Sequence, residues 1–329
     1  MRMARRTLLG VAVSAAATPM RAAPLPSIRI GVLRFGTVSW EIDVIHRNAL
    51  DVAASIAIEP VELATAQAAQ VALQSREVDM IVVDWLWVAR QRGSGADWTF
   101  VPFSNAVGAL IAPADSPVRD VPDLAGRTLG VAGSPLDKSW LILRAYASRR
   151  YGIDLDSKTN KQFGPPPLLA EQMQAGRLDA LLTYWTFAAK AQAAGARRIL
   201  LVEDAVGAMG IPAGVPYIGY TFAERWAGRN PALIDGLVTA SRRARGILLT
   251  SDAEWQRVKP LTGAADDAEL ERLRDWYRHG IPLSWGDPER RAAAQLFELL
   301  ATIGGQDLVG PISAVPSGTF WPITWQADD

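Results

Sequence analysis

The sequence repeats itself at an offset of 100 residues. Residues 74–89 align with residues 174–189 at this offset, where Gln, Asp, Trp and Ala coincide and the apolar positions match in kind. Ser39-Trp40 and Ser139-Trp140 align at the same offset. A period of this length is too long for the unit of a solenoid. The repeat therefore predicts two lobes of similar design in one chain.

Short apolar runs alternate with stretches of helical period through most of the sequence. Helices are expected over residues 39–54 and 66–74, and residues 230–304 are almost wholly helical in pattern. The expected strands lie at residues 28–33, 78–83, 99–103, 127–131, 178–182 and 198–202. Strands that alternate with helices indicate parallel sheets built from strand–helix–strand units. We therefore expect an α/β protein in which each lobe is a mainly parallel sheet flanked by helices, with extra C-terminal helices.

Composition excludes several classes of function. The 329 residues contain 34 Lys and Arg against 34 Asp and Glu, so no net charge favours a nucleic-acid backbone as partner. The absence of cysteine excludes disulfides, a thiolate nucleophile and a Cys-type zinc site. His46 and His279 lie in no metal-ligand motif, so neither a cofactor nor a resident metal is expected. Arg242, Arg243 and Arg245 form a basic run that we interpret as the solvated face of a helix.

Residues 1–27 have the composition of an export signal. Their four charged residues are all arginines, and an apolar stretch over residues 8–17 follows the pair Arg5-Arg6. This stretch is shorter than the roughly 20 residues that span a bilayer. It resembles a twin-arginine signal, with a general secretory signal as the alternative, and cleavage is expected at about residues 17–23. The mature chain would carry 30 basic against 34 acidic residues and no lipid-attachable cysteine, as a free periplasmic protein.

Four loops are expected where strands end, two in each lobe. Ligands of open α/β sheets bind there, because helix N-termini present unpaired N–H groups. Tryptophan walls with a few polar side chains are typical of a small-molecule site. Two polar residues that follow the expected strand at 99–103 could add contacts near a hinge. The candidate ligand-binding residues are Thr37, Ser39, Trp40, Glu41, Asp84, Trp85, Ser104, Asn105, Ser134, Asp137, Lys138, Ser139, Tyr184 and Trp185.

These residues leave the charge of the ligand open. Hydroxyl groups at helix starts, together with Lys138, favour a sulfonate, a carboxylate or another oxyanion. Glu41, Asp43, Asp84 and Asp137 bring four carboxylates into the same loops. Carboxylates beside tryptophans suit a cationic amine, and carboxylates alone suit a metal or its chelate. A cationic amine or a metal chelate is therefore the alternative ligand.

Two segments resemble those of periplasmic solute-binding proteins. Residues 121–131, VPDLAGRTLGV, resemble a hinge-side motif of these proteins, and residues 174–182 resemble their helix-to-strand segment. With the export signal, they resemble the nitrate/sulfonate/taurine type of ABC-transporter binding protein, in the NMT1/THI5-like superfamily. The resemblance implies a two-lobed, type II periplasmic binding protein that captures a small organic solute and delivers it to a membrane permease. We expect it to act as a monomer.

The resemblance also implies where the chain crosses between the lobes. Crossings are expected near residues 111–113 and 216–220. Lobe one would then comprise residues 28–112 and 217–329, and lobe two residues 113–216. The same superfamily contains pyrimidine-synthase enzymes with a cysteine-rich iron site, which a chain without cysteine cannot build. A binding protein without catalytic turnover is therefore expected, with an enzyme or a sensor domain on the same fold as less favoured alternatives.

Overall fold

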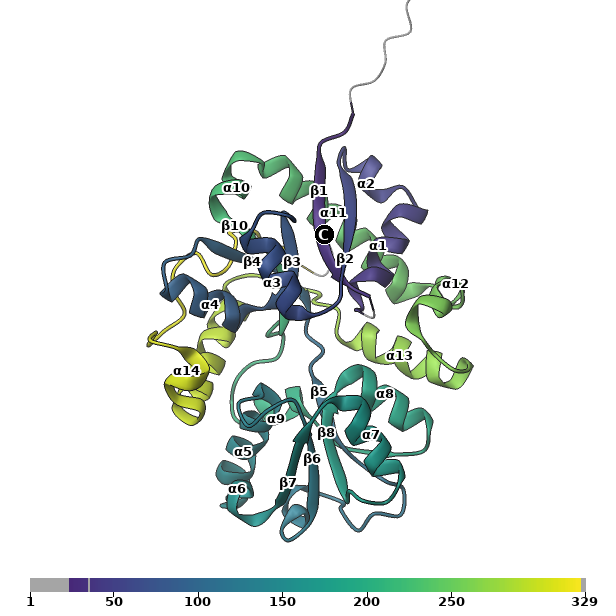
Figure 1. The fold of residues 1–329 in the computed structure, drawn as a ribbon, viewed down its shortest axis with the longest axis vertical. Coiled ribbons are helices and arrows are strands. Elements are labelled where there is room, and N and C mark those ends of the chain that lie inside the picture. The colour runs from purple at the N-terminus through teal and green to yellow at the C-terminus, as the bar shows by residue number, and fades with distance from the viewer. Residues whose placement is uncertain (1–23, 35, 327–329) are drawn as a thin grey trace, which may run out of the picture.

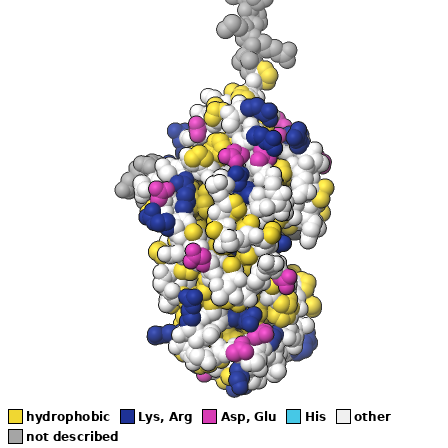
Figure 2. Space-filling view, turned by 90° about the vertical axis from the view of Figure 1, so that its left-hand side faces the viewer, with side chains coloured by type: hydrophobic (Ala, Val, Ile, Leu, Met, Phe, Trp, Pro, Cys, Tyr) yellow, Lys and Arg dark blue, Asp and Glu magenta, His cyan; other side chains and the backbone are white. Residues whose placement is uncertain are grey.

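The computed structural model describes residues 24–34 and 36–326 and shows two lobes stacked end to end (Figure 1). The expected export signal at residues 1–27 lies almost entirely outside the described residues. No helix within the described ranges combines the length and the apolar character needed to cross a membrane. On the face in Figure 2, acidic and basic side chains are interspersed over both lobes.

Lobe one contains a five-stranded sheet and most of the helices. Its strands are β1 (Ser27–Leu33), β2 (Ala57–Leu63), β3 (Met80–Asp84), β4 (Trp98–Ser104) and β10 (Ile218–Ala223). Its helices are α1 (Val38–Arg47), α2 (Leu50–Ala53), α3 (Ala66–Gln74), α4 (Trp85–Gly93), α10 (Glu224–Arg229), α11 (Pro231–Thr250), α12 (Asp252–Thr262), α13 (Asp267–His279) and α14 (Asp287–Val309). The C-terminal helices thus complete the lobe that the N-terminal strands begin.

Lobe two has a sheet of the same size. Its strands are β5 (Gly108–Ala112), β6 (Thr128–Ala132), β7 (Asn160–Gly164), β8 (Ala180–Tyr184) and β9 (Arg197–Leu201). Its helices are α5 (Lys138–Tyr151), α6 (Leu155–Lys158), α7 (Pro166–Gln174), α8 (Trp185–Ala193) and α9 (Val202–Ala208), together with the 3-10 helix η1 (Val121–Leu124). Every residue of β5 is buried, so this strand lies in the interior of its lobe.

The two sheets have the same topology. Their strand orders are β2-β1-β3-β10-β4 and β7-β6-β8-β5-β9. β1 pairs in parallel with β2 and β3, as β6 does with β7 and β8. β10 and β5 are antiparallel to both of their neighbours. The expected mainly parallel α/β sheets are confirmed, and each is mixed because one strand in the fourth position runs against the other four.

The antiparallel strand in each sheet is the one that follows a crossing between the lobes. The first crossing lies at residues 105–107, between β4 and β5, and the second at residues 209–217, between α9 and β10. The first crossing precedes the expected position at residues 111–113. The physical reason is that β5 pairs with β8 and β9 and therefore belongs to lobe two.

Each crossing strand carries a glycine where its backbone closely approaches a neighbouring strand. A Cβ atom on Gly108 would lie 2.1 Å from the carbonyl oxygen of Thr183, and one on Gly219 would lie 2.2 Å from that of Val101. Any side chain there would force the strands apart. The two crossing strands therefore enter their sheets in the same way.

The sequence repeat corresponds to a repeat of structure. Helix α3, strand β3 and helix α4 recur as α7, β8 and α8, with each boundary displaced by 100 residues. Arg76 and Gly176, which also align, have positive φ angles of 62° and 70° in the turn before the strand. The two lobes are therefore built from the same strand–helix–strand unit, as the repeat predicts.

The repeated aspartate joins the strands in the second and third positions of each sheet, β1 with β3 and β6 with β8. The Arg29 backbone N–H donates to Asp79 Oδ2 over 3.0 Å, and the Asp79 N–H donates to the Arg29 carbonyl over 2.9 Å. In lobe two, the Thr128 N–H donates to Asp179 Oδ2 over 2.8 Å, and the Asp179 N–H donates to the Thr128 carbonyl over 2.9 Å. Asp79 and Asp179 therefore hold the register of parallel strands.

We expect Asp79→Ala and Asp179→Ala each to lower the free energy of unfolding by about 1 to 3 kcal/mol, because each leaves a strand N–H without its acceptor. Urea denaturation of the purified variants measures this. Glu171→Ala, at an exposed position of α7, is the control and should change the value by less than about 0.5 kcal/mol. Equal changes in all three variants would contradict the assigned role.

Candidate functional site

A cleft of about 340 Å³ lies between the lobes, where the ends of β3, β6 and β8 face one another. Five of the candidate residues line it: Asp84, Ser134, Asp137, Lys138 and Tyr184. Its other lining residues are Leu86, Trp87, Arg90, Gly133, Leu136, Asp307 and Leu308. Side chains of both lobes and of α14 thus meet at one site.

Asp84 and Asp137 are the N-caps of α4 and α5. Asp84 Oδ1 accepts a hydrogen bond from the Trp87 N–H over 2.9 Å, and Asp137 Oδ1 accepts one from the Ser139 N–H over 2.8 Å. These bonds satisfy N–H groups that a helix start otherwise leaves free. Both carboxylates are therefore partly compensated by the helix that they cap.

Tyr184 links the end of β8 to the start of α5. Its hydroxyl donates to Asp137 Oδ2 over 3.2 Å. Burial raises the pKa of Tyr184, and the charge of Asp137 raises it further. Tyr184 therefore remains a neutral hydrogen-bond donor at the cleft across physiological pH.

An ion pair crosses the cleft. Lys138 Nζ of lobe two lies 3.5 Å from Asp84 Oδ2 of lobe one, and about a quarter of each side chain remains exposed, 26% and 29% respectively. Ion pairs with this much exposure contribute little to stability. The pair is therefore weak enough to be replaced by a ligand.

Trp40 and Trp185 meet across the lobes. Their ring centroids lie 6.0 Å apart at an interplanar angle of 86°, and the residues are 2% and 7% exposed. Trp40 also packs on Trp255 and Tyr277, and its Nε1 donates to the Leu261 carbonyl over 3.1 Å. The two tryptophans therefore pack against each other instead of standing apart as walls of an open crevice.

Trp85 lies in the core of lobe one, not at the cleft where it was expected. It is 2% exposed and packs on Phe320, with ring centroids 6.1 Å apart. The reason is the phase of α4, which begins at Trp85 and turns Trp87 and Arg90, three residues apart, toward the cleft. Ser139, at the start of α5, is likewise buried.

Glu41, in the first turn of α1, is fully buried and is not exposed toward the cleft as its position in the expected loop suggested. Its Oε2 lies 3.0 Å from Arg245 Nε, and its Oε1 accepts hydrogen bonds from Tyr220, over 2.8 Å, and from Ser241. The Tyr277 hydroxyl donates to Oε2 over 3.4 Å. Burial raises the pKa of Tyr220 and of Tyr277, so both stay protonated donors.

The four remaining candidates are not among the described residues that line the cleft. Thr37 is the N-cap of α1 without a side-chain hydrogen bond to the helix, and Ser39 donates to the Gly36 carbonyl over 2.6 Å. Ser104 accepts from the Ala106 N–H over 3.1 Å at the first crossing. Asn105 lines a separate cavity. Within the described ranges, no group of three or more His, Asp or Glu side chains is placed to hold a metal ion.

Comparison with known proteins places the chain in a family. Residues 52–253 match the family described as NMT1/THI5 like. The chain belongs to this family. The expected resemblance is thereby confirmed, and the matched region extends from α2 through lobe two to α12. No curated protein sequence matches the chain.

Several solved structures share the fold. The periplasmic aliphatic sulphonate-binding protein SsuA from Escherichia coli is 18% identical, with a TM-score of 0.72 over 91% of this chain and 93% of that one. The alkanesulfonate-binding protein SsuA from Xanthomonas axonopodis pv. citri, bound to MOPS, is 16% identical, with a TM-score of 0.66 over 91% and 99%. The desulfurization enzyme DSZB is 14% identical, with a TM-score of 0.56 over 89% and 97%. The two-lobed periplasmic binding protein fold is therefore shown.

Sequence reasoning missed three polar or aromatic groups at the cleft: Trp87, Arg90 and Asp307. Helical spacing from the N-cap at Asp84 could have identified the first two. Asp307 had no such signal, because it reaches the cleft from α14, more than 200 residues farther along the chain. Tertiary packing alone brings it there.

The buried Glu41–Arg245 pair generates a prediction about stability. Glu41→Ala should lower the free energy of unfolding by about 3 to 5 kcal/mol, because it leaves Arg245 as a buried charge without its carboxylate. Glu41→Leu combined with Arg245→Met removes both charges and should regain most of this loss. Denaturant titrations measure both.

The matched control for this prediction is the surface pair of Arg225 and Asp97, whose atoms lie at a similar distance of 2.9 Å but whose arginine is 81% exposed. Arg225→Ala should cost less than about 1 kcal/mol. A double variant no more stable than Glu41→Ala would show that the charge of Arg245 is not the cause.

Proposed function

We propose that this protein is the periplasmic substrate-binding component of an ABC importer, and that it captures a small organic oxyanion of the sulfonate class between its lobes. The observation that carries the proposal is the cleft formed by strand ends of both lobes, with Lys138 facing Asp84 across it. The lobes are joined by two crossings, which would let them open and close on a solute. The export signal expected at residues 1–27 supports a periplasmic location. A membrane permease would be the partner of the monomer.

The position of Lys138 supports an anionic ligand. Lys138 is the first residue of α5, where the helix dipole presents partial positive charge. A lysine in this position is unfavourable for the helix by itself, and an anion beside it would be attracted by both charges. When the lobes part, an oxyanion could take the place of Asp84 beside the ammonium group.

Two further helix starts support the same class of ligand. The N-caps of α1 and α8, Thr37 and Tyr184, make no side-chain hydrogen bond to their helices. In contrast, Asp84 and Asp137 cap α4 and α5. The uncapped helices carry Trp40 and Trp185, so the apolar body of an organic solute would lie between these rings if the lobes separated.

A cationic amine or a metal chelate is the second candidate. It is favoured by three carboxylates among the described lining residues of the cleft, Asp84, Asp137 and Asp307, against two basic residues in the same set, Lys138 and Arg90. Ammonium groups and hard metals both bind carboxylate oxygens. The fold shared with DSZB also keeps turnover as an outcome to be tested.

Calorimetry with alkanesulfonates, MOPS, nitrate, alkylamines and an iron chelate would test the proposal. At least one sulfonate should bind, be recovered unchanged and alter the fluorescence of Trp40 or Trp185. Lys138→Met should weaken binding of that sulfonate by about tenfold to a hundredfold, because a charge-assisted contact is lost. Lys158→Met, at an exposed position of α6, is the control and should bind as the wild type does.

Other outcomes separate the alternatives. Binding of an amine but no sulfonate, weakened by Asp307→Asn and not by Lys138→Met, would favour the cationic ligand. Conversion of a bound sulfonate to a new product would favour an enzyme. Equal affinities of the Lys138→Met and Lys158→Met variants for a sulfonate that does bind would contradict the assigned role of Lys138.

A further inference from the structure

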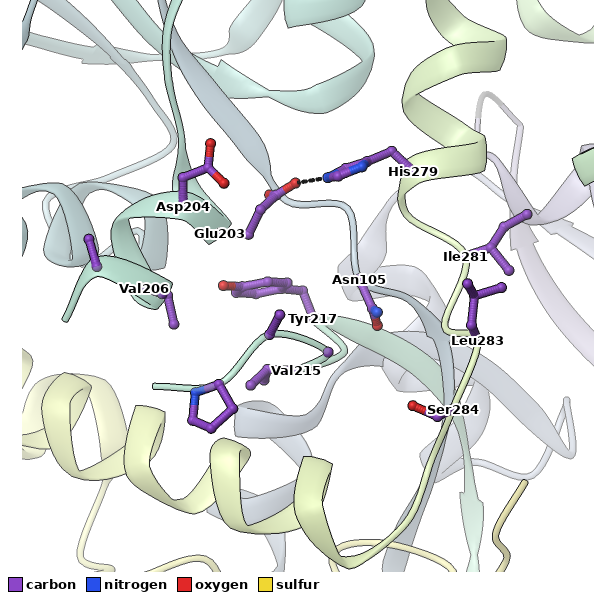
Figure 3. Close-up of a pocket in the computed structure, with 15 residues that line it drawn as sticks. Asn105, Glu203, Asp204, Val206, Val215, Tyr217, His279, Ile281, Leu283 and Ser284 are labelled. Atoms are coloured by element: carbon purple, nitrogen blue, oxygen red, sulfur yellow. Dashed lines mark hydrogen bonds and ion pairs between the residues drawn. The ribbon is translucent and has the colours of Figure 1, made fainter. Parts of the chain in front are cut away.

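A second cavity, of about 670 Å³, lies at the hinge (Figure 3). It lies beside the ends of β4 and β9. In the sheet of lobe one, β4 is two positions from β3, and in the sheet of lobe two, β9 is two positions from β8. None of its described lining residues also lines the cleft. Asn105 and Tyr217 line it from the two crossings, Glu203 from α9 and His279 from the end of α13. It therefore contacts both lobes and both connections between them.

The charge of this cavity is negative. Glu203 and Asp204 line it, and among its described lining residues none is a lysine or an arginine. His279 is the only basic side chain in that set, and its Nε2 lies 2.8 Å from Glu203 Oε1 (Figure 3). One histidine compensates at most one of the two carboxylates, so the cavity attracts cations.

Two buried acceptors of the cavity residues have no donor in the described part of the chain. They are Glu203 Oε2 and the side-chain oxygen of Asn105. A buried acceptor without a donor is costly and uncommon in folded proteins. Burial raises the pKa of Glu203, and the neighbouring His279 only partly opposes this effect. A ligand with N–H groups would supply the missing donors.

The rest of the cavity lining is apolar. Tyr217 is buried, and Val215, Ile281 and Leu283 add aliphatic surface around it (Figure 3). An apolar lining with a few polar groups on one side is typical of small-molecule sites. Such a lining accommodates a short hydrocarbon body with a polar head, and a strongly hydrated inorganic ion would gain nothing from it.

We propose that this hinge cavity is a second ligand site that takes a small organic cation. The ammonium N–H groups of an alkylammonium are received by Glu203 and Asn105, and its hydrocarbon body lies against Val215, Ile281 and Leu283. The site is independent of the solute cleft, so it stands whether or not the cleft binds a sulfonate. Because it touches both lobes, its occupant favours the closed arrangement.

Calorimetry with butylammonium and 1,4-diaminobutane tests this site, with 1-butanol and butanoate as matched probes that lack the positive charge. The two amines should bind one per chain, and the alcohol and the carboxylate should not. Glu203→Gln keeps the shape and removes the charge, so it should weaken amine binding by about tenfold to a hundredfold. Glu171→Gln, at an exposed position of α7, should leave amine binding unchanged.

Two more variants keep the outcome decisive. Ala208→Phe adds a ring at the cavity lining without altering charge and should abolish amine binding even if Glu203→Gln does not fold. Asp307→Asn changes the cleft and should leave amine binding intact. The proposal is overturned if neither amine binds to the wild type, or if Asp307→Asn removes binding that Ala208→Phe retains.

Discussion

Two crossings of the chain determine how every other part of this protein can be arranged. Each crossing leads into an antiparallel strand, β5 or β10, that occupies the fourth position of the sheet it enters. Lobe one is therefore incomplete until the chain has built lobe two and returned as β10. Because the other four strands of each sheet run in one direction, their carboxyl ends face the opposite lobe, and the cleft follows from the topology.

Contacts across the lobes then determine how firmly the closed arrangement is held. Helices α13 and α14 of lobe one pack on α8 and α5 of lobe two (Figure 1). The polar contacts include Lys190 with Glu269, at 2.7 Å, and His279 with Glu203, both partly exposed and thus individually weak. Burial of the Trp40 and Trp185 rings gives a larger gain in the free energy of lobe closure, and this gain depends little on direction. A solute that enters between these rings must replace that gain with contacts of its own.

The sequence allowed the prediction of elements that depend on local pattern, but not of contacts that depend on partners far along the chain. The repeat aligned α3, β3 and α4 with α7, β8 and α8, because the apolar pattern that marks each of these elements lies within a few consecutive residues. The run at 108–112 is apolar throughout, and such a run does not indicate which sheet it joins. Arg245 looked solvated in its basic run, yet it is buried against Glu41, 204 residues away in the sequence.

The preference of the cleft for ligand charge depends on how far each charged group is already compensated. Asp84 and Asp137 accept hydrogen bonds from backbone N–H groups of the helices that they cap, so they offer less negative charge to a ligand than their number suggests. Arg90 lies in the last turn of α4, where the helix dipole already compensates a cation. Lys138, at the start of α5, lies where the helix dipole opposes its charge, whereas Asp307 lies in the single turn of α14 that follows the break at Gly305.

Lys138 therefore has the most to gain from a ligand of opposite charge. Lys138 also has the N-terminal dipole of α5 acting in the same direction, which favours an anionic group at that side of the cleft. Asp307 approaches from the side of α14, beyond the break in that helix at Gly305. A single ligand that carries an oxyanion toward Lys138 and a weaker donor toward Asp307 would satisfy both groups better than a simple cation could.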